Sequence, residues 1–163
     1  MNVRTLFKIT QGMYITGAAD HDGRLVGSAI DSVMVAEMDP PQVLVSLNDA
    51  SYTREIVKKT KKMSLSVLPQ TQTIDIIKRF GYQSSRMADK WADTPHDLID
   101  NLPVVKDSVC YLILKVASMI ETSHHTVFYC DVVEAAGLTM ESPMSYGYYQ
   151  EILLPQSRKA QAK

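Results

Sequence analysis

Two hydroxyl residues, Ser51 and Thr53, stand where a short helix is expected to begin, shortly after Asn48. A helix start exposes backbone N–H groups, which together with hydroxyl donors can bind an anion such as a phosphate. Ser at such a position is also a common helix cap, and the residue types alone favour that structural interpretation. Arg86 and Lys90, in a later polar segment, could supply a cation, although solvated surface positions are the simpler interpretation for both.

Histidine and cysteine are the other residues that could carry chemistry. His124 and His125 are adjacent, so on a regular strand they point to opposite faces and only one can line a site. By residue type alone, a surface or interface position is favoured for His125. Cys110 and Cys130 lie in strongly apolar stretches, as buried cysteines do, and the spacing of the Cys and His residues fits no closed zinc site.

The composition describes one soluble globular domain of 163 residues, 45% hydrophobic, with a formal net charge of −1. A chain of this length can bury a core without a disulfide or a metal. The near-neutral charge argues against a general nucleic-acid binder, and no apolar run approaches the roughly 20 residues that span a bilayer. Residues 1–8 lack the apolar stretch of a signal peptide, so we expect a cytoplasmic protein.

Strands with a few short helices are expected along most of the chain, and the Asp-His-Asp-Gly sequence at 20–23 predicts a hairpin turn. The predicted strands are 13–19, 25–37, 42–48, 63–68, a strand around 110–120, and 126–136. The predicted helices are 52–61 and 71–80, the second ending at Gly81. Residues 82–103 are expected to be irregular, and residues 153–163 to form a flexible tail after a domain that spans 3–152.

The last two predicted strands are apolar on both faces. In the first of them, Cys110, Leu112 and Leu114 alternate with Tyr111 and Ile113. Strands of this kind must be covered on both sides, and two short helices give little cover. We therefore expect either a barrel that packs on something else or a second subunit, and we carry the homodimer forward.

Seven segments, in this order, resemble the flavin reductase family with the FMN-binding split-barrel fold. They are residues 26–33, residues 39–48, Ser51-x-Thr53, Phe80-Gly81, Ser84-x-Arg86 with Asp89-Lys90-Trp91, residues 125–128 and residues 143–149. The resemblance covers about residues 3 to 152 and is greatest to the flavin domain of high-molecular-weight rubredoxins. The rubredoxin module itself is absent, because its iron centre needs four cysteines and the chain has two.

The resemblance implies a mainly β domain with short helices, a split β-barrel, assembled as a homodimer that holds FMN near the subunit interface. It implies an oxidoreductase in which bound FMN accepts hydride from NADH or NADPH and passes electrons to a flavin or a redox-protein acceptor. No GxGxxG turn is present, so the nicotinamide nucleotide would bind transiently over the flavin. Two alternatives remain open: an FMN-binding electron-transfer protein with little reductase activity, and a split-barrel relative that has lost its flavin.

The resemblance also assigns roles to residues. Ser51 and Thr53 would hold the phosphate, with Arg86 or Lys90 as the cation, and the isoalloxazine would lie along residues 29–33. Gly27 would let a ligand or another backbone segment approach closely. The candidate cofactor-binding residues are Gly27, Ser28, Ala29, Ile30, Asp31, Ser32, Val33, Ser46, Leu47, Asn48, Ser51, Thr53, Phe80, Gly81, Arg86, Lys90 and Tyr148.

Two positions depart from the family pattern. Asp31 stands where the family commonly has Asn, and a carboxylate near the pyrimidine edge would disfavour an anionic reduced flavin. His124 stands where the family often has Asp, next to His125, the residue that by resemblance positions the flavin and the nicotinamide. Tyr146 and Tyr148 share a face at strand spacing and could cover the flavin or seal the dimer interface, of which we favour the interface.

Overall fold

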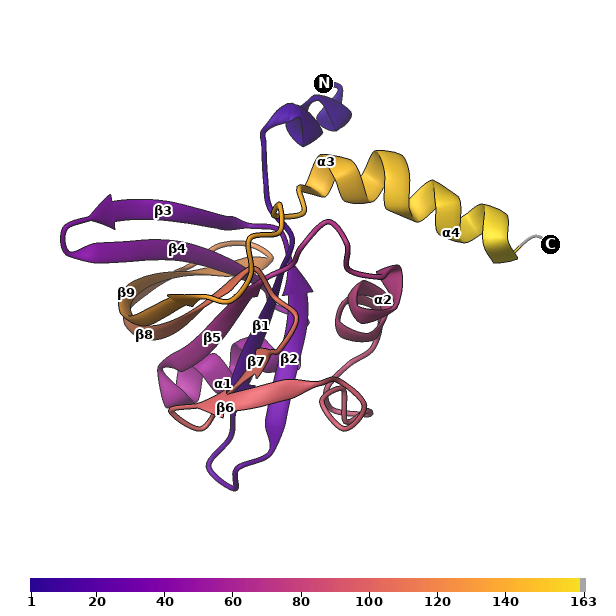
Figure 1. The fold of residues 1–163 in the computed structure, drawn as a ribbon. Helices are drawn as coiled ribbons and strands as arrows, with labels where there is room; N and C mark the ends of the chain where they lie inside the picture. Colours follow the sequence, from indigo (N-terminus) through magenta and orange to yellow (C-terminus); the bar gives the residue numbers. More distant parts are fainter. Residues whose placement is uncertain (162–163) are drawn as a thin grey trace.

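The structure, a computed structural model, describes residues 1–161. Alternating apolar residues form a sheet of seven strands in the order β2-β1-β5-β8-β9-β4-β3, with antiparallel pairing throughout (Figure 1). These strands are β1 Tyr14–Ala19, β2 Leu25–Ile30, β3 Val33–Met38, β4 Pro41–Asn48, β5 Lys62–Val67, β8 Cys110–Glu121 and β9 His125–Gly137. The expected mainly β architecture is confirmed.

The two edge strands of this sheet, β2 and β3, are neighbours in the chain. Only Asp31 and Ser32 separate them, and so short a link spans roughly 10 Å. The sheet must therefore curl until its edges approach at this point, while β3 and β4 project away from β1 and β2 (Figure 1). This is the geometry of a split barrel. The Ser46 N–H donates to the Ser32 carbonyl (2.9 Å), which continues the β3–β4 pairing up to the link.

A single strand over residues 25–37 is thus a wrong prediction. Apolar residues lie on both sides of Asp31 and Ser32, but β2 ends at Ile30 and β3 begins at Val33. Between the two strands, the Ser32 hydroxyl donates to the Asp31 carboxylate at 2.8 Å. The predicted turn at 20–23 is confirmed. Gly23 has a φ of 81°, and Asp20 Oδ1 accepts from two backbone N–H groups of the turn.

The helical elements are a 3₁₀ turn Val3–Lys8, α1 Tyr52–Thr60, α2 Ile74–Tyr82, α3 Tyr146–Tyr148, a π-helical turn Tyr149–Leu153 and α4 Leu154–Gln161 (Figure 1). Of these, α1 packs Ile56 and Val57 into the core of the barrel. Gly81 lies inside α2 and does not end it. Residues 154–161, expected to belong to a flexible tail, are helical, and residues 162 and 163 lie outside the described residues. Tyr146 and Tyr148 stand on a helix, so the shared strand face predicted for them is also wrong. Among residues 1–161, no helix has the length and apolar character needed to cross a membrane.

The segment after α2, expected to be irregular, contains a two-stranded hairpin, β6 His96–Ile99 and β7 Leu102–Val105. Asp100 and Asn101 form its turn with φ values of 50° and 61°, a conformation that these two residue types tolerate better than most. Leu102 and Val104 of this hairpin pack against Tyr111 and Ile113. The hairpin therefore covers part of the outer face of β8.

The barrel interior holds a continuous apolar core that includes Val45, Leu65, Leu114 and Phe128, all at most 1% exposed. Ile113 and Leu114 are neighbours on β8 and are both buried, on opposite faces of the strand: Leu114 belongs to the barrel core, and Ile113 packs with the β6–β7 hairpin. The barrel core on one face and the β6–β7 hairpin on the other explain within one chain much of the two-faced apolar pattern of β8. Met34, Val35 and Ile120 nevertheless remain more than half exposed on β3 and β8.

Candidate functional site

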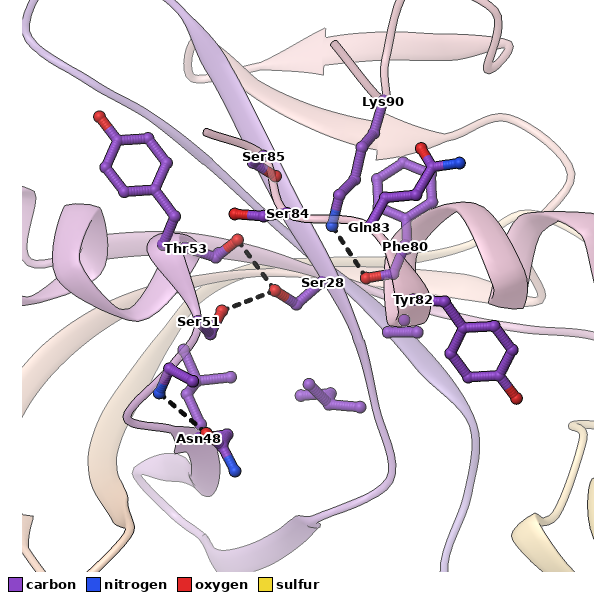
Figure 2. A pocket seen from close by; sticks show the side chains of 16 residues that line it. Ser28, Asn48, Ser51, Thr53, Phe80, Tyr82, Gln83, Ser84, Ser85 and Lys90 are labelled. Carbon is purple, nitrogen blue, oxygen red and sulfur yellow. Dashed lines mark hydrogen bonds between the residues drawn. The ribbon is translucent and has the colours of Figure 1, made fainter. Parts of the chain in front are cut away.

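A cavity of about 270 Å³ lies between β2, the start of α1 and the segment that follows α2 (Figure 2). The strand contributes Ser28, Ala29 and Ile30. The other two elements bring hydroxyl, amide and amine groups to the same space, so the cavity is polar at the end near α1.

Three hydroxyl groups meet at this end of the cavity. The Ser28 Oγ atom lies 2.8 Å from Ser51 Oγ and donates to Thr53 Oγ1 at 2.9 Å (Figure 2). Ser51 occupies the N-cap position of α1, yet its side chain makes no capping hydrogen bond, so the prediction of a simple cap is wrong. The hydroxyl cluster and the backbone N–H groups at the start of α1 are donors of the kind that bind phosphate.

Lys90 brings a cation to the cavity from the opposite side. Its side chain is 3% exposed, and Nζ donates to the carbonyl oxygens of Gly27 and Phe80, both at 2.9 Å. An ammonium group has three N–H donors, so one is left for another acceptor. Burial lowers the pKa of Lys90 to about 8, and within residues 1–161 no carboxylate forms an ion pair with it.

Gly27 serves packing in this structure. A Cβ atom at this position would lie 2.7 Å from the Phe80 ring and 2.9 Å from the Thr16 carbonyl oxygen. The buried Ser85 hydroxyl accepts from the Gly27 N–H (3.2 Å) and donates to the Gly27 carbonyl (3.1 Å). The glycine thus lets α2 and the 84–86 turn pack closely against β2, behind the cavity wall.

Arg86 lies at the rim and not in the cavity. Its guanidinium carbon is 4.4 Å from the centroid of the Tyr52 ring, and Nη2 pairs with Glu55 Oε1. Arg24 also lies over this ring, at 5.9 Å, and donates to the Ser85 carbonyl. Arg86 and Lys90 were the two residues predicted to supply a cation to a bound phosphate, and of these only Lys90 lines the cavity.

A second cavity, of about 290 Å³, adjoins the first. Ala29, Ile30, Gly81 and Tyr82 line both cavities. Asp31 lines the second only, with Tyr146 and Tyr149 from the C-terminal segment. The Tyr82 and Tyr149 hydroxyl oxygens are 2.7 Å apart, and burial together with this hydrogen bond raises the pKa of Tyr149.

The structure brings most of the predicted cofactor residues together. Those that line the first cavity are Ser28, Ala29, Ile30, Leu47, Asn48, Ser51, Thr53, Phe80, Gly81 and Lys90. Ser32, Val33 and Ser46 line a third cavity, of about 320 Å³. Tyr148, on α3, lines none of these three cavities, whereas Tyr149 was not predicted and lines the second.

His125 lies at the start of β9, exposed to solvent, and in the sheet register it stands opposite Asn48, which lines the first cavity. Sequence reasoning left Ala50, Tyr52, Tyr82, Gln83, Ser84 and Ser85 out of the site. For Tyr52 and the two serines a signal existed, because Tyr52 lies between Ser51 and Thr53, and Ser84 and Ser85 directly precede Arg86, residues that were already candidates.

A split barrel whose cavity gathers three hydroxyl groups and a buried amine has donors suited to a phosphorylated cofactor. The chain belongs to the flavin reductase like domain family, whose sequence profile matches residues 6–152. This is a family of flavin-dependent oxidoreductases, so the family and the reaction class expected from the sequence are confirmed.

Similar proteins agree with this assignment. A high molecular weight rubredoxin of Moorella thermoacetica is 30% identical over 154 residues, which cover 93% of this chain and 67% of that protein. The NADH:FAD oxidoreductase SgcE6 of Streptomyces globisporus C-1027 has a TM-score of 0.80 at 17% identity, over 88% of this chain and 85% of that one. A Sinorhizobium meliloti 1021 protein also has a TM-score of 0.80, at 22% identity over 88% of this chain. The present chain covers only 49% of that protein, about half its length. The two structural likenesses show the fold.

Proposed function

We propose that this chain is an FMN-binding reductase that takes its electrons from NADH or NADPH. The observation that carries the proposal is the position of Lys90, a buried amine without a carboxylate partner in the described chain, across the cavity from the Ser28, Ser51 and Thr53 hydroxyls. A buried cation of this kind is stable when an anion joins it. The phosphate of FMN is an anion that all these donors fit.

The residues present fit the rest of the cofactor as well. The ring system is flat and largely apolar, and Ala29, Ile30 and Gly81 offer small or apolar surfaces in both adjoining cavities. Asp31 would lie near the polar end of the ring. When bound, FMN supplies hydride acceptance and electron delivery, and the chain supplies binding and orientation.

His125 is proposed to position the nicotinamide. It is exposed, so a transient substrate can reach it, and its backbone partner Asn48 lines the first cavity. A positioning role needs a hydrogen-bond donor close to the reacting rings and no proton transfer.

The proposed assembly is a homodimer. Met34 of β3 and Ile120 of β8 are 57% and 69% exposed, and the strand pairings place both on one face of the β3-β4-β9-β8 half of the sheet. An exposed apolar face on a paired sheet favours a second copy as its cover. The cytoplasmic location expected from the sequence stays a prediction.

An electron-transfer protein with little reductase activity is the second candidate. It is favoured by the similarity to a high molecular weight rubredoxin, of which this chain matches 67% of the length. Such a domain would exchange electrons with a redox protein. A flavin or a protein acceptor is proposed for the reductase as well.

The visible spectrum of the purified protein, followed by anaerobic mixing with NADH and with NADPH, tests the proposal. We expect flavin absorption bands that stay with the protein after FMN addition and removal of unbound FMN by gel filtration, and bleaching of these bands by at least one of the two nucleotides. Bands without bleaching would favour the electron-transfer protein. A protein that takes up no flavin at all would contradict both candidates.

A further inference from the structure

Close to the first cavity, three polar side chains from α1, from β9 and from the residue after β4 contact one another. The Arg54 Nε atom donates to Thr126 Oγ1 at 2.9 Å and lies 3.0 Å from Asp49 Oδ1. The Thr126 hydroxyl in turn donates to Asp49 Oδ1 at 3.3 Å. Thr126 is fully buried, and the Arg54 side chain is only 16% exposed. We call these three residues the polar triangle.

The polar triangle lies one position along the chain from three residues of the proposed site. Its members directly follow Thr53 on α1, Asn48 at the end of β4 and His125 at the start of β9. Thr53 and Asn48 line the first cavity (Figure 2), whereas no member of the triangle does. The triangle therefore joins the helix that would bind the phosphate to the strand that carries the proposed nicotinamide residue.

The sheet register shows how contacts at Thr126 act on the residue before it. Thr126 stands opposite Leu47, which belongs to the barrel core, and His125 stands opposite Asn48. Residues opposite each other share a face of the sheet, and successive residues of a strand point to opposite faces. Holding the Thr126 side chain on the core side therefore sets the rotation of β9 about its own axis, and with it the direction of the exposed His125 side chain.

Arg54 supplies the main polar contact between α1 and this end of β9. The Asp49 N–H donates to the His124 carbonyl at 3.0 Å, which attaches the start of β9 to β4 but not to the helix. One helical turn beyond Arg54, Lys58 pairs with Glu121 of β8, and these side chains are 29% and 59% exposed. Ion pairs that are open to solvent contribute little. The buried contact of Arg54 is therefore the one that fixes the helix against the strand.

We infer that Arg54 is a positioning residue for flavin reduction. Through Thr126 it sets the direction of His125 relative to the hydroxyl cluster at the start of α1, and so aligns the nicotinamide with the flavin. The inference rests on the proposed function, in particular on the role of His125. Misalignment of the reacting rings costs rate, whereas FMN affinity depends on the hydroxyl cluster and Lys90.

Stopped-flow reduction by saturating NADH or NADPH, together with FMN titration, tests this role in Arg54→Met and Thr126→Val. We expect the limiting rate to fall about fivefold or more, but no further than in His125→Ala, while FMN affinity changes by less than about threefold. Thr126→Ser keeps the hydroxyl and should have the wild-type rate. Lys58→Met removes the neighbouring ion pair from the same helix and is the matched control, which should also have the wild-type rate.

A role that acts through His125 also determines how the variants combine. In the His125→Ala background, Arg54→Met should cause little further loss of rate, because the side chain that it directs is absent. A contribution to stability alone would reduce the rate by the same factor in both backgrounds. Thermal unfolding of each variant measures its stability separately.

The outcomes separate this inference from the proposed function. Wild-type rates in Arg54→Met and Thr126→Val, or equal losses with and without His125, overturn the inference and leave the reductase. A larger loss of FMN affinity than of rate also overturns it. Val has nearly the shape of Thr, so Thr126→Val keeps the test decisive if Arg54→Met does not fold. A wild-type flavoprotein that neither nucleotide reduces overturns the proposed function and the inference with it.

Discussion

The Nζ atom of Lys90 lies 2.9 Å from the carbonyl oxygen of Gly27, across 63 positions of sequence. The same side chain that brings a cation to the first cavity therefore ties the segment after α2 to β2. Anion binding and the position of this segment are coupled through one residue, and Lys90 is the first target for experiments.

Affinity for FMN should decrease at alkaline pH. Burial lowers the pKa of Lys90 to about 8 in the free protein, and only the protonated amine attracts a phosphate. The affinity is therefore full below about pH 8 and falls by up to about tenfold for each pH unit above it, until the higher pKa of the complex is passed. Binding titrations between about pH 6.5 and pH 9.5 measure this, and Lys90→Met should bind more weakly without the pH dependence. The same slope in Lys90→Met would show that another group titrates.

Ser28→Ala should weaken FMN binding about tenfold or more, because a hydrogen bond to a charged group contributes about 1.5–3 kcal/mol. Ser28 is the shared member of the hydroxyl cluster, bonded to Ser51 and to Thr53. Equilibrium titration with FMN measures the effect. Ser142→Ala, an exposed serine in the segment before Pro143, is the matched control and should bind as wild type does. Similar losses in both variants would argue against a phosphate site at the cluster.

Asp31→Asn should raise the reduction potential of the bound flavin. The carboxylate lines the second cavity and accepts a hydrogen bond from the Ser32 hydroxyl at 2.8 Å. Removal of a negative charge near the ring would favour an anionic reduced flavin, by about 30 mV if the interaction is worth about 1.4 kcal/mol for a two-electron couple. Spectroelectrochemical titration gives both potentials, and equal values would place Asp31 away from the ring.

His125→Ala should slow reduction by NADH or NADPH about tenfold or more and change FMN affinity little, since proximity effects act on the reacting geometry. His125 is exposed and stands opposite Asn48 in the sheet. Stopped-flow reduction and FMN titration measure the two quantities separately. The neighbouring His124→Ala is the matched control. A larger loss of FMN binding than of reduction rate would assign His125 to the cofactor.

Ile120→Glu should weaken the proposed dimer by at least about tenfold, because a charge would be buried in the interface without a partner. Ile120 is 69% exposed on the face that it shares with Met34. Sedimentation velocity measures the change in oligomeric state. Leu98→Glu, at a 56% exposed position on β6, is the control and should leave the assembly intact. A monomeric wild-type protein would contradict the homodimer.

The fold was predictable where local chemistry decided it. Strand alternation and the Asp and Gly residues at 20–23 correctly indicate β1, its hairpin and the later long strands. The end of β2 before Asp31 was missed, because apolar residues lie on both sides of Asp31 and Ser32. The chain leaves one strand and begins another there because β2 and β3 form the two edges of the sheet. The β6–β7 hairpin was missed because its turn, Asp100-Asn101, uses two residues with positive φ and no glycine.

By itself, the sequence determined the family, the mainly β fold and most residues of the first cavity, because these depend on residue types in order along the chain. Tertiary structure alone decided the roles of individual side chains. Ser51 could cap its helix, yet its hydroxyl lies beside that of Ser28. Arg86 and Lys90 were equal candidates for a phosphate, yet one pairs with Glu55 and the other is buried beside the cavity. Burial, pKa and hydrogen-bond partners depend on segments that are distant in sequence, so only the folded chain sets them.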